Sequence, residues 1–188
     1  MFYTLAFILH FGLLSFLIFL FIRLKFSISL IPLTLIAAFI TTYLSVLAEQ
    51  LGYRFDVING PDPVMTLIYG LFAVGLSYQL LFFIYFKISV FNSKYSSDPF
   101  FIILNIILFS LFSVFVKLIF GNPSDYLLQP ILFFSGQLFL SLIIGYFMAM
   151  AKRSEDPYLQ FRFLNSGLGA AIIVQGLMEF FIWTGHFP

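Results

Sequence analysis

Six long runs of apolar residues divide the chain, and short polar connections separate them. The runs cover roughly residues 3–22, 27–48, 64–86, 100–120, 128–150 and 163–183. Each run is long enough for an α-helix that crosses the hydrocarbon core, which takes about 20 residues. The connections are too short to fold as a soluble domain. The pattern therefore predicts an all-α, polytopic membrane helix bundle of about six transmembrane helices, forming one integral-membrane domain over residues 1–188.

The composition supports a membrane environment. The chain is 62% hydrophobic and only 9% charged, whereas soluble domains carry roughly 25% charged residues. This small number of polar groups cannot cover the surface of a globular protein. The lipid bilayer is therefore the expected solvent. The net charge of +1 gives no electrostatic reason to expect a nucleic-acid partner. The absence of cysteine excludes disulfides, thiolate metal sites and cysteine nucleophiles.

Lysine and arginine are unevenly distributed among the connections. Seven of the nine follow the first, third and fifth runs: Arg23, Lys25, Lys87, Lys94, Lys152, Arg153 and Arg162. The other two are Arg54 and Lys117, and the long stem of Lys117 can snorkel to the outer surface. The positive-inside rule then predicts that both termini lie outside. We expect an integral protein of a prokaryotic cytoplasmic membrane.

Three ionisable residues lie within or at the ends of apolar runs without a simple anchoring role: His10, Glu49 and Glu179. Charges inside a bilayer are costly, so each is a candidate functional group. The predicted topology places all three in the outer half of the bundle. Gln175 lies one helical turn before Glu179, on the same face. Arg54 is the expected ion-pair partner for Glu49 or Glu179.

Simpler explanations remain open for these residues. Glu49 and Arg54 can belong to a solvated turn, and Glu179 can snorkel to the interface. His10 can be satisfied by one carbonyl group of a neighbouring helix. Neither a haem nor a metal is expected, because His10 has no second axial histidine at matching depth and the spacing of the carboxylates fits no ligand pattern.

Three segments together resemble one family. They are AEQLGYRF at 48–55, PDPVMTLIYGLFAVGLSY at 61–78 and AAIIVQGLMEFF at 170–181. The first is similar to an E-E-x-x-x-R motif, the second to a turn that leads into a helix with Tyr-Gly and Val-Gly pairs, and the third to an H-G-x-x-D helix. In this order they resemble the PrsW-type glutamic intramembrane proteases, which are related to the CAAX prenyl endopeptidases.

The resemblance implies a site in which glutamates and a histidine activate water against a peptide bond. Glu49 matches the first glutamate of the motif, Arg54 the arginine, and Glu179 stands in place of an aspartate. However, Gln50 replaces the second glutamate and Gln175 replaces the histidine. An amide cannot take up a proton at neutral pH, so neither glutamine can act as a general base.

A further departure falls in the third run, where the family commonly has Glu-Asn and this chain has Phe82 and Phe83. Only Glu49 as base and Glu179 as acid would remain as a catalytic pair. Around them the resemblance implies a shell of Gln50, Arg54, Gln175 and His10. The resemblance therefore implies a protease-like membrane protein with impaired catalysis, which binds the helix of a single-pass partner.

Two other functions remain open. One is an active intramembrane peptidase that uses Glu49 and Glu179. The other is a small integral subunit of a larger secretion, motility or respiratory complex, in which the apolar surface contacts lipid and other membrane proteins. A transporter is less favoured, because no helix is visibly broken near its middle and no inverted repeat is visible.

Overall fold

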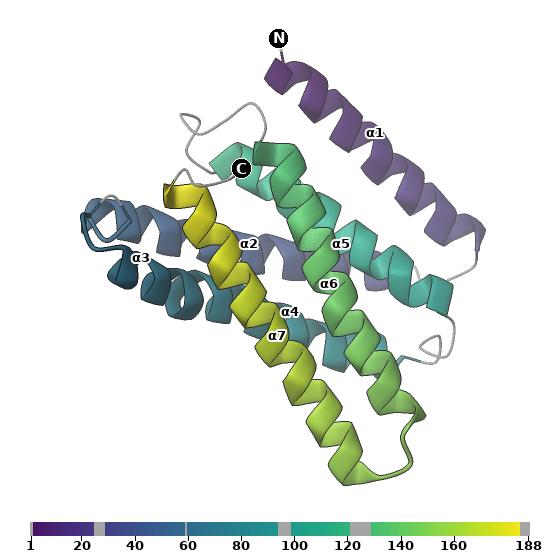
Figure 1. Ribbon diagram of the computed structural model, residues 1–188. Coiled ribbons are helices and arrows are strands. Elements are labelled where there is room, and N and C mark those ends of the chain that lie inside the picture. Colours follow the sequence, from purple (N-terminus) through teal and green to yellow (C-terminus); the bar gives the residue numbers. More distant parts are fainter. Residues whose placement is uncertain (1, 25–28, 59, 94–98, 121–128, 185–188) are drawn as a thin grey trace.

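The computed structural model describes residues 2–24, 29–58, 60–93, 99–120 and 129–184, which are almost entirely helical and contain no strand. The elements are α1 (Phe2–Arg23), α2 (Leu30–Arg54), α3 (Pro63–Tyr69), the π-helix η1 (Gly70–Gly75), α4 (Leu76–Tyr85), the π-helix η2 (Phe86–Phe91), α5 (Pro99–Phe120), α6 (Gln129–Arg153) and α7 (Pro157–Thr184). Because α3, η1, α4 and η2 follow without interruption, they form one long rod (Figure 1). The predicted all-α bundle is confirmed.

Five helical stretches are long and apolar enough to cross a membrane. They are Leu30–Arg54, Pro63–Phe91, Phe101–Phe120, Ser135–Arg153 and Pro157–Thr184. Within α1, the shorter segment Phe11–Leu20 is also apolar. Large apolar side chains such as Phe72 and Ile88 are exposed on the outside of the bundle, as expected for a surface that contacts lipid. The chain therefore has the architecture of a multi-pass membrane protein.

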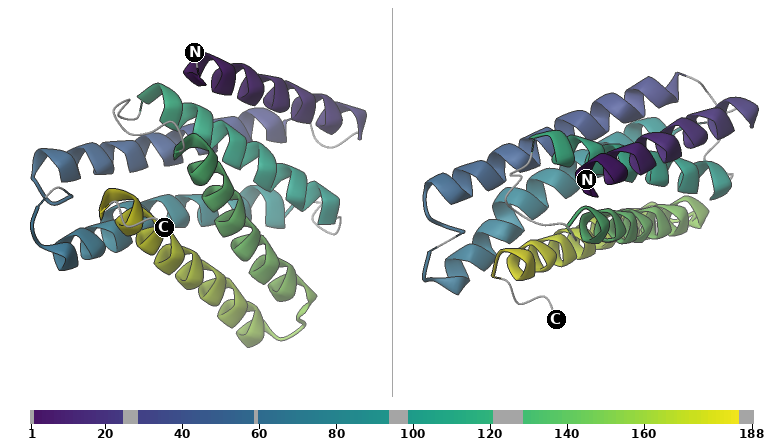
Figure 2. Two further views of the ribbon diagram at one scale, coloured as in Figure 1. Left: turned by 45° about the horizontal axis from the view of Figure 1, so that its top comes forward. Right: turned by 90° about the horizontal axis from the view of Figure 1, so that it is seen from above.

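The helices pack around α5 and the α3–η2 rod. α6 and α7 form a hairpin in which α6 contacts α5, while α7 contacts η1 and α4 (Figure 2). α2 packs against both α5 and α4, and α1 lies at the edge of the bundle against α5. Aromatic rings fill the centre, where the Phe82 and Phe109 ring centroids lie 4.6 Å apart.

The end of α2 differs from the prediction. The helix continues to Arg54, six residues past the predicted boundary at residue 48, because glutamate, glutamine and leucine favour the helix. It ends in a Schellman motif, in which Asp56 is left-handed with φ 54°. The Asp56 N–H donates to the Tyr53 carbonyl at 3.2 Å, and the Val57 N–H donates to the Gly52 carbonyl at 2.9 Å. Glu49 therefore lies in the second-last turn of α2 and not in a loop.

α7 and η1 approach closely through three glycines. A Cβ atom at Gly70 would lie 3.0 Å from the Gly176 carbonyl oxygen, and one at Gly75 would lie 3.3 Å from the Gly176 nitrogen. A Cβ atom at Gly176 would lie 2.8 Å from the Leu71 Cα. Small residues of this kind let two helix backbones come into contact in a membrane. The contact holds α7 against the rod at the residue that follows Gln175 and about one turn before Glu179, two of the polar residues described below.

Candidate functional site

Lys117 joins two buried carboxylates that come from different helices. Its Nζ atom lies 2.7 Å from Glu49 Oε1 and 3.7 Å from Glu179 Oε1. The side chain of Lys117 is 20% exposed, that of Glu49 is 12% exposed and that of Glu179 is 1% exposed. Because each residue lies within about two turns of the C-terminal end of its helix, the three charges gather at the end of the bundle where α2, α5 and α7 finish.

Three buried glutamines continue this cluster. Gln175 Nε2 donates to Glu179 Oε1 at 2.7 Å. Gln79 Nε2 and Gln137 Nε2 both donate to Gln175 Oε1, at 3.1 Å and 2.8 Å. All three glutamines are almost completely buried. We call the six linked residues the charged network: Glu49, Gln79, Lys117, Gln137, Gln175 and Glu179.

The charged network depends on local helix geometry. Gln175 and Glu179 are four residues apart on α7, so they share one face. Gln79 follows η1 by one turn, and the glycine contact between η1 and α7 brings its side chain within reach of Gln175. π-turns inside α-helices are often found at functional sites. Five helices, α2, α4, α5, α6 and α7, thus contribute to one polar cluster.

Hydrogen bonding leaves part of the network unsatisfied. Glu179 Oε2, Gln79 Oε1 and Gln137 Oε1 are buried and have no hydrogen-bond partner in the part of the chain that the structure describes. All three are oxygens and, when Glu179 is ionised, all three are acceptors. Buried polar atoms are normally paired, so an unpaired set needs an explanation.

The structure brings together only part of the predicted site. Glu49, Glu179 and Gln175 lie in the charged network, whereas Gln50 and Arg54 are exposed. Gln50 Nε2 donates to the Phe120 carbonyl at 3.3 Å. Within the described residues Arg54 has no ion pair.

The expectation that Arg54 pairs with Glu49 or Glu179 is therefore wrong, because Lys117 takes that place. Arg54 follows Glu49 by five residues, which turns it about 140° around the helix and away from the carboxylate. His10 lies in α1, but its side chain falls outside the described part of the structure.

Sequence reasoning missed Lys117, Gln79 and Gln137. A signal was present for each of them. Gln79 and Gln137 are isolated amides within apolar runs, where a polar group is costly unless it finds a partner. Lys117 shares a face of α5 with the buried serines Ser110 and Ser113, and such a polar stripe indicates a side chain directed into the bundle.

Phe82 and Phe83 occupy the positions where the resembling family has Glu-Asn. Phe82 is completely buried and its ring packs against those of Phe86 and Phe109, at centroid distances of 4.9 Å and 4.6 Å. Phe83 is buried as well. These positions therefore contribute to the aromatic core and add no acid, base or hydrogen-bond donor to the charged network.

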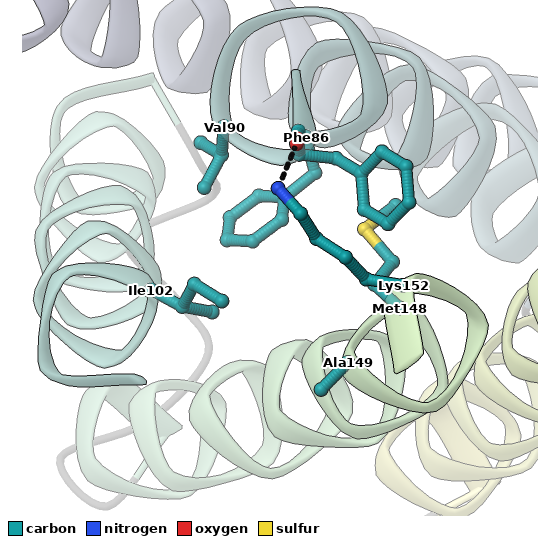
Figure 3. Close-up of a pocket in the computed structure, with 7 residues that line it drawn as sticks. Phe86, Val90, Ile102, Met148, Ala149 and Lys152 are labelled. Atoms are coloured by element: carbon teal, nitrogen blue, oxygen red, sulfur yellow. Dashed lines mark hydrogen bonds between the residues drawn. The ribbon is translucent and has the colours of Figure 1, made fainter. Parts of the chain in front are cut away.

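A small hollow lies away from the charged network, near the start of α5 and the end of α6 (Figure 3). Lys152 extends into it, donates to the Phe91 carbonyl at 3.0 Å, and lies 5.3 Å from the centre of the Phe91 ring. The remaining lining is apolar and consists of Phe86, Val90, Ile102, Met148 and Ala149. With a single cation already engaged by a carbonyl, this hollow offers no acid–base pair.

The charged network is thus the strongest candidate site, and its chemistry is that of carboxylates, one ammonium group and amides. Within the described residues, no group of three histidine, cysteine, aspartate or glutamate side chains could hold a metal ion. No protein-family model, curated protein or solved structure matches the chain.

Proposed function

We propose that this multi-pass membrane protein is related to the glutamic intramembrane proteases but does not hydrolyse peptides, and that it binds the transmembrane helix of a partner protein. One observation carries the proposal. Lys117 lies between Glu49 and Glu179, which are the two groups that the resemblance would use as base and acid. The ammonium group engages both of them at the positions where an attacking water would have to be activated.

The chemistry of the cluster argues against hydrolysis. A general base must accept a proton from water, and general acid–base catalysis commonly contributes about 10²–10⁴-fold to the rate. Glu49 Oε1 instead accepts a hydrogen bond from the Lys117 ammonium group. Glu179 Oε1 accepts one from Gln175, and Gln175 cannot take the place of a histidine base.

The burial of the cluster also argues against hydrolysis. A peptide bond must come within about 3–3.5 Å of the attacking group. Glu179 and Gln175 are fully enclosed by the bundle, so a substrate could reach them only if α7 separated from its neighbours. Only the end of the network formed by Glu49 and Lys117 is partly exposed.

That partly exposed end supports binding of a partner helix. Beside it, the Phe120 ring packs against Tyr43 and Phe39 at centroid distances of 5.4 Å and 5.9 Å. Phe39, Leu47 and Phe120 are exposed to the surroundings of the bundle. A helix that crosses this surface would pack against the apolar side chains and could offer a polar group to the ion pair.

A cleavage assay tests the first half of the proposal. The wild-type chain and Glu49→Gln are reconstituted into liposomes with a panel of single-pass substrates. We expect no cleavage by either protein. Cleavage by the wild type that disappears in Glu49→Gln would overturn the proposal and establish an active peptidase.

Site-specific photocrosslinking tests the second half. A benzophenone amino acid replaces Phe120, which is exposed one turn after Lys117 on α5, and in a matched control it replaces Ile88, which is exposed at the other end of the bundle. We expect position 120 alone to crosslink to the transmembrane segment of a single-pass protein, identified by peptide mapping. Equal crosslinking at the two positions, or crosslinking only to lipid, would contradict partner binding at this surface.

A further inference from the structure

Three helical elements meet at the small hollow shown in Figure 3. η2 ends at Phe91, α5 begins at Pro99 and α6 ends at Arg153, so the hollow lies at one end of the bundle. The connections at this end carry seven of the nine basic residues, and the positive-inside rule predicts that it faces the cytoplasm. Lipid headgroups and acyl chains meet at the level where transmembrane helices end.

The π-helix η2 shapes this hollow. Phe86 and Phe91, the first and last residues of η2, both line it. In an α-helix, residues five apart are turned by about 140° from each other. The i→i+5 hydrogen bonds of a π-helix bring such residues to similar sides of the helix, and π-turns are often found at functional sites. The hollow therefore depends on a local departure from α-helical geometry.

The lining of the hollow has a buried apolar floor and a more exposed rim. The floor consists of Phe86, Val90 and Met148, and the rim of Phe91, Ile102, Ala149 and Lys152. The empty space is about 230 Å³ with its open side included. Pockets that enclose a small molecule are larger, at roughly 300–1,000 Å³, and a helix of about 10–12 Å diameter cannot enter the hollow. The space suits part of a flexible apolar chain.

Lys152 is the cation at the rim of the hollow. Its Nζ atom donates to the Phe91 carbonyl at 3.0 Å and lies 5.3 Å from the centre of the Phe91 ring. Within the described residues Lys152 has no ion pair, and the acidic residues that follow it, Glu155 and Asp156, are exposed. An ammonium group has three N–H donors, so two of them are left for another acceptor.

We propose that this hollow binds one anionic phospholipid of the cytoplasmic leaflet, with the lipid phosphate on Lys152 and part of an acyl chain against the apolar floor. The cytoplasmic leaflet has a negative surface potential that attracts basic residues. A net negative headgroup fits because Arg153 and Lys87 are also exposed at this end of the bundle. The site is separate from the charged network and does not depend on the proposed partner helix.

Native mass spectrometry of the purified full-length chain tests the class of ligand. The affinity is measured for phosphatidylglycerol, for phosphatidylcholine with the same acyl chains, and for glycerol phosphate, which is the headgroup without chains. We expect phosphatidylglycerol to bind at least about fivefold more tightly than phosphatidylcholine, and glycerol phosphate to bind more weakly than either lipid. Equal affinity for the two lipids, or binding of glycerol phosphate as tight as that of phosphatidylglycerol, would overturn the proposal.

Three variants locate the lipid in the hollow. Lys152→Gln should weaken phosphatidylglycerol binding by about fivefold. Lys87→Gln, the matched control, removes an exposed lysine that does not line the hollow, and should weaken binding by less than about twofold. Ala149→Leu keeps every charge but fills the rim with a larger side chain, so it should also lower the affinity.

Two outcomes with these variants contradict the lipid site. One is a loss of affinity in Lys152→Gln that is no larger than the loss in Lys87→Gln. The other is an unchanged affinity in Ala149→Leu. Thermal unfolding followed by circular dichroism shows which variants are folded, and Ala149→Leu decides the question if Lys152→Gln does not fold.

Discussion

Two buried polar clusters lie in this bundle, and they differ in what their side chains leave unpaired. The charged network lies where α2 and α5 end. The second, which we call the neutral cluster, contains Thr34, Tyr85 and Asn105 and lies where α2 and α5 begin. There the Thr34 hydroxyl bonds to the Tyr85 hydroxyl and to the Leu30 carbonyl, the latter at 2.7 Å. Asn105 Nδ2 donates to the carbonyl of Phe101 at 3.2 Å.

The two clusters differ in whether packing alone accounts for them. Within the described residues, each side chain of the neutral cluster finds a partner in the cluster or on its own helix backbone, so hydrogen bonding is satisfied and no charge is left over. In the same part of the chain, the charged network sets two carboxylates against one lysine and leaves three buried oxygens without a hydrogen-bond partner. A satisfied cluster is explained by packing alone, whereas an unsatisfied and charged cluster calls for a ligand or a partner.

Cysteine labelling should place the two clusters on opposite sides of the membrane. The chain has no cysteine, so a single introduced thiol reports its own side. We expect Phe55→Cys, next to the end of α2, to react with an impermeant maleimide in intact cells. Glu155→Cys, between α6 and α7, should react only after permeabilisation, because basic residues flank it. The reverse pattern would move the charged network to the cytoplasmic side.

Removal of the shared cation should give the largest loss of stability. Lys117→Met leaves two buried carboxylates without their partner, and breaking a buried ion pair in this way costs about 3–5 kcal/mol. The free energy of unfolding, measured in detergent, provides the test. The control Lys152→Met changes an exposed lysine that binds a carbonyl, and should cost less than about 1 kcal/mol. Equal losses in the two variants would show that Lys117 has no special role.

The neutral cluster should respond far more weakly. Tyr85→Phe removes one hydroxyl from a set of uncharged hydrogen bonds, and we expect a loss of about 0.5–1.5 kcal/mol in the free energy of unfolding. Tyr146→Phe, at an exposed position, should change it by no more than about 0.5 kcal/mol. If Tyr85→Phe cost as much as Lys117→Met, the distinction between the two clusters would fail.

The fold could largely be predicted from the sequence, because a bilayer requires long apolar stretches and these are visible without knowledge of tertiary contacts. The boundaries were harder to predict. α2 continues through Glu49 and Gln50 because its end is set by the left-handed residue Asp56, and polarity alone does not reveal where a backbone turns. The two π-helices in the rod also left no signal in the apolar pattern.

The candidate site could be predicted only in part. Glu49, Glu179 and Gln175 were identified because acidic and amide groups are rare in apolar runs. Their ion-pair partner Lys117 was not identified, because a single sequence does not show how each helix is rotated about its own axis. Lys117 could be interpreted as a snorkelling residue, yet the packing of α5 against α2 turns it inward toward Glu49. The shared hydrogen-bond partner of Gln79 and Gln137 could not be predicted either, because it depends on tertiary packing that brings both amides to Gln175.

A double-mutant cycle on Glu49 and Lys117 tests most directly whether the lysine holds the carboxylate. The free energy of unfolding is measured for the wild type, Glu49→Gln, Lys117→Met and the double variant. If the pair interacts as the structure indicates, the double variant loses less stability than the two single losses combined, by about 1–3 kcal/mol. Single losses that add to within about 0.5 kcal/mol would show that Lys117 and Glu49 do not form a stabilising ion pair.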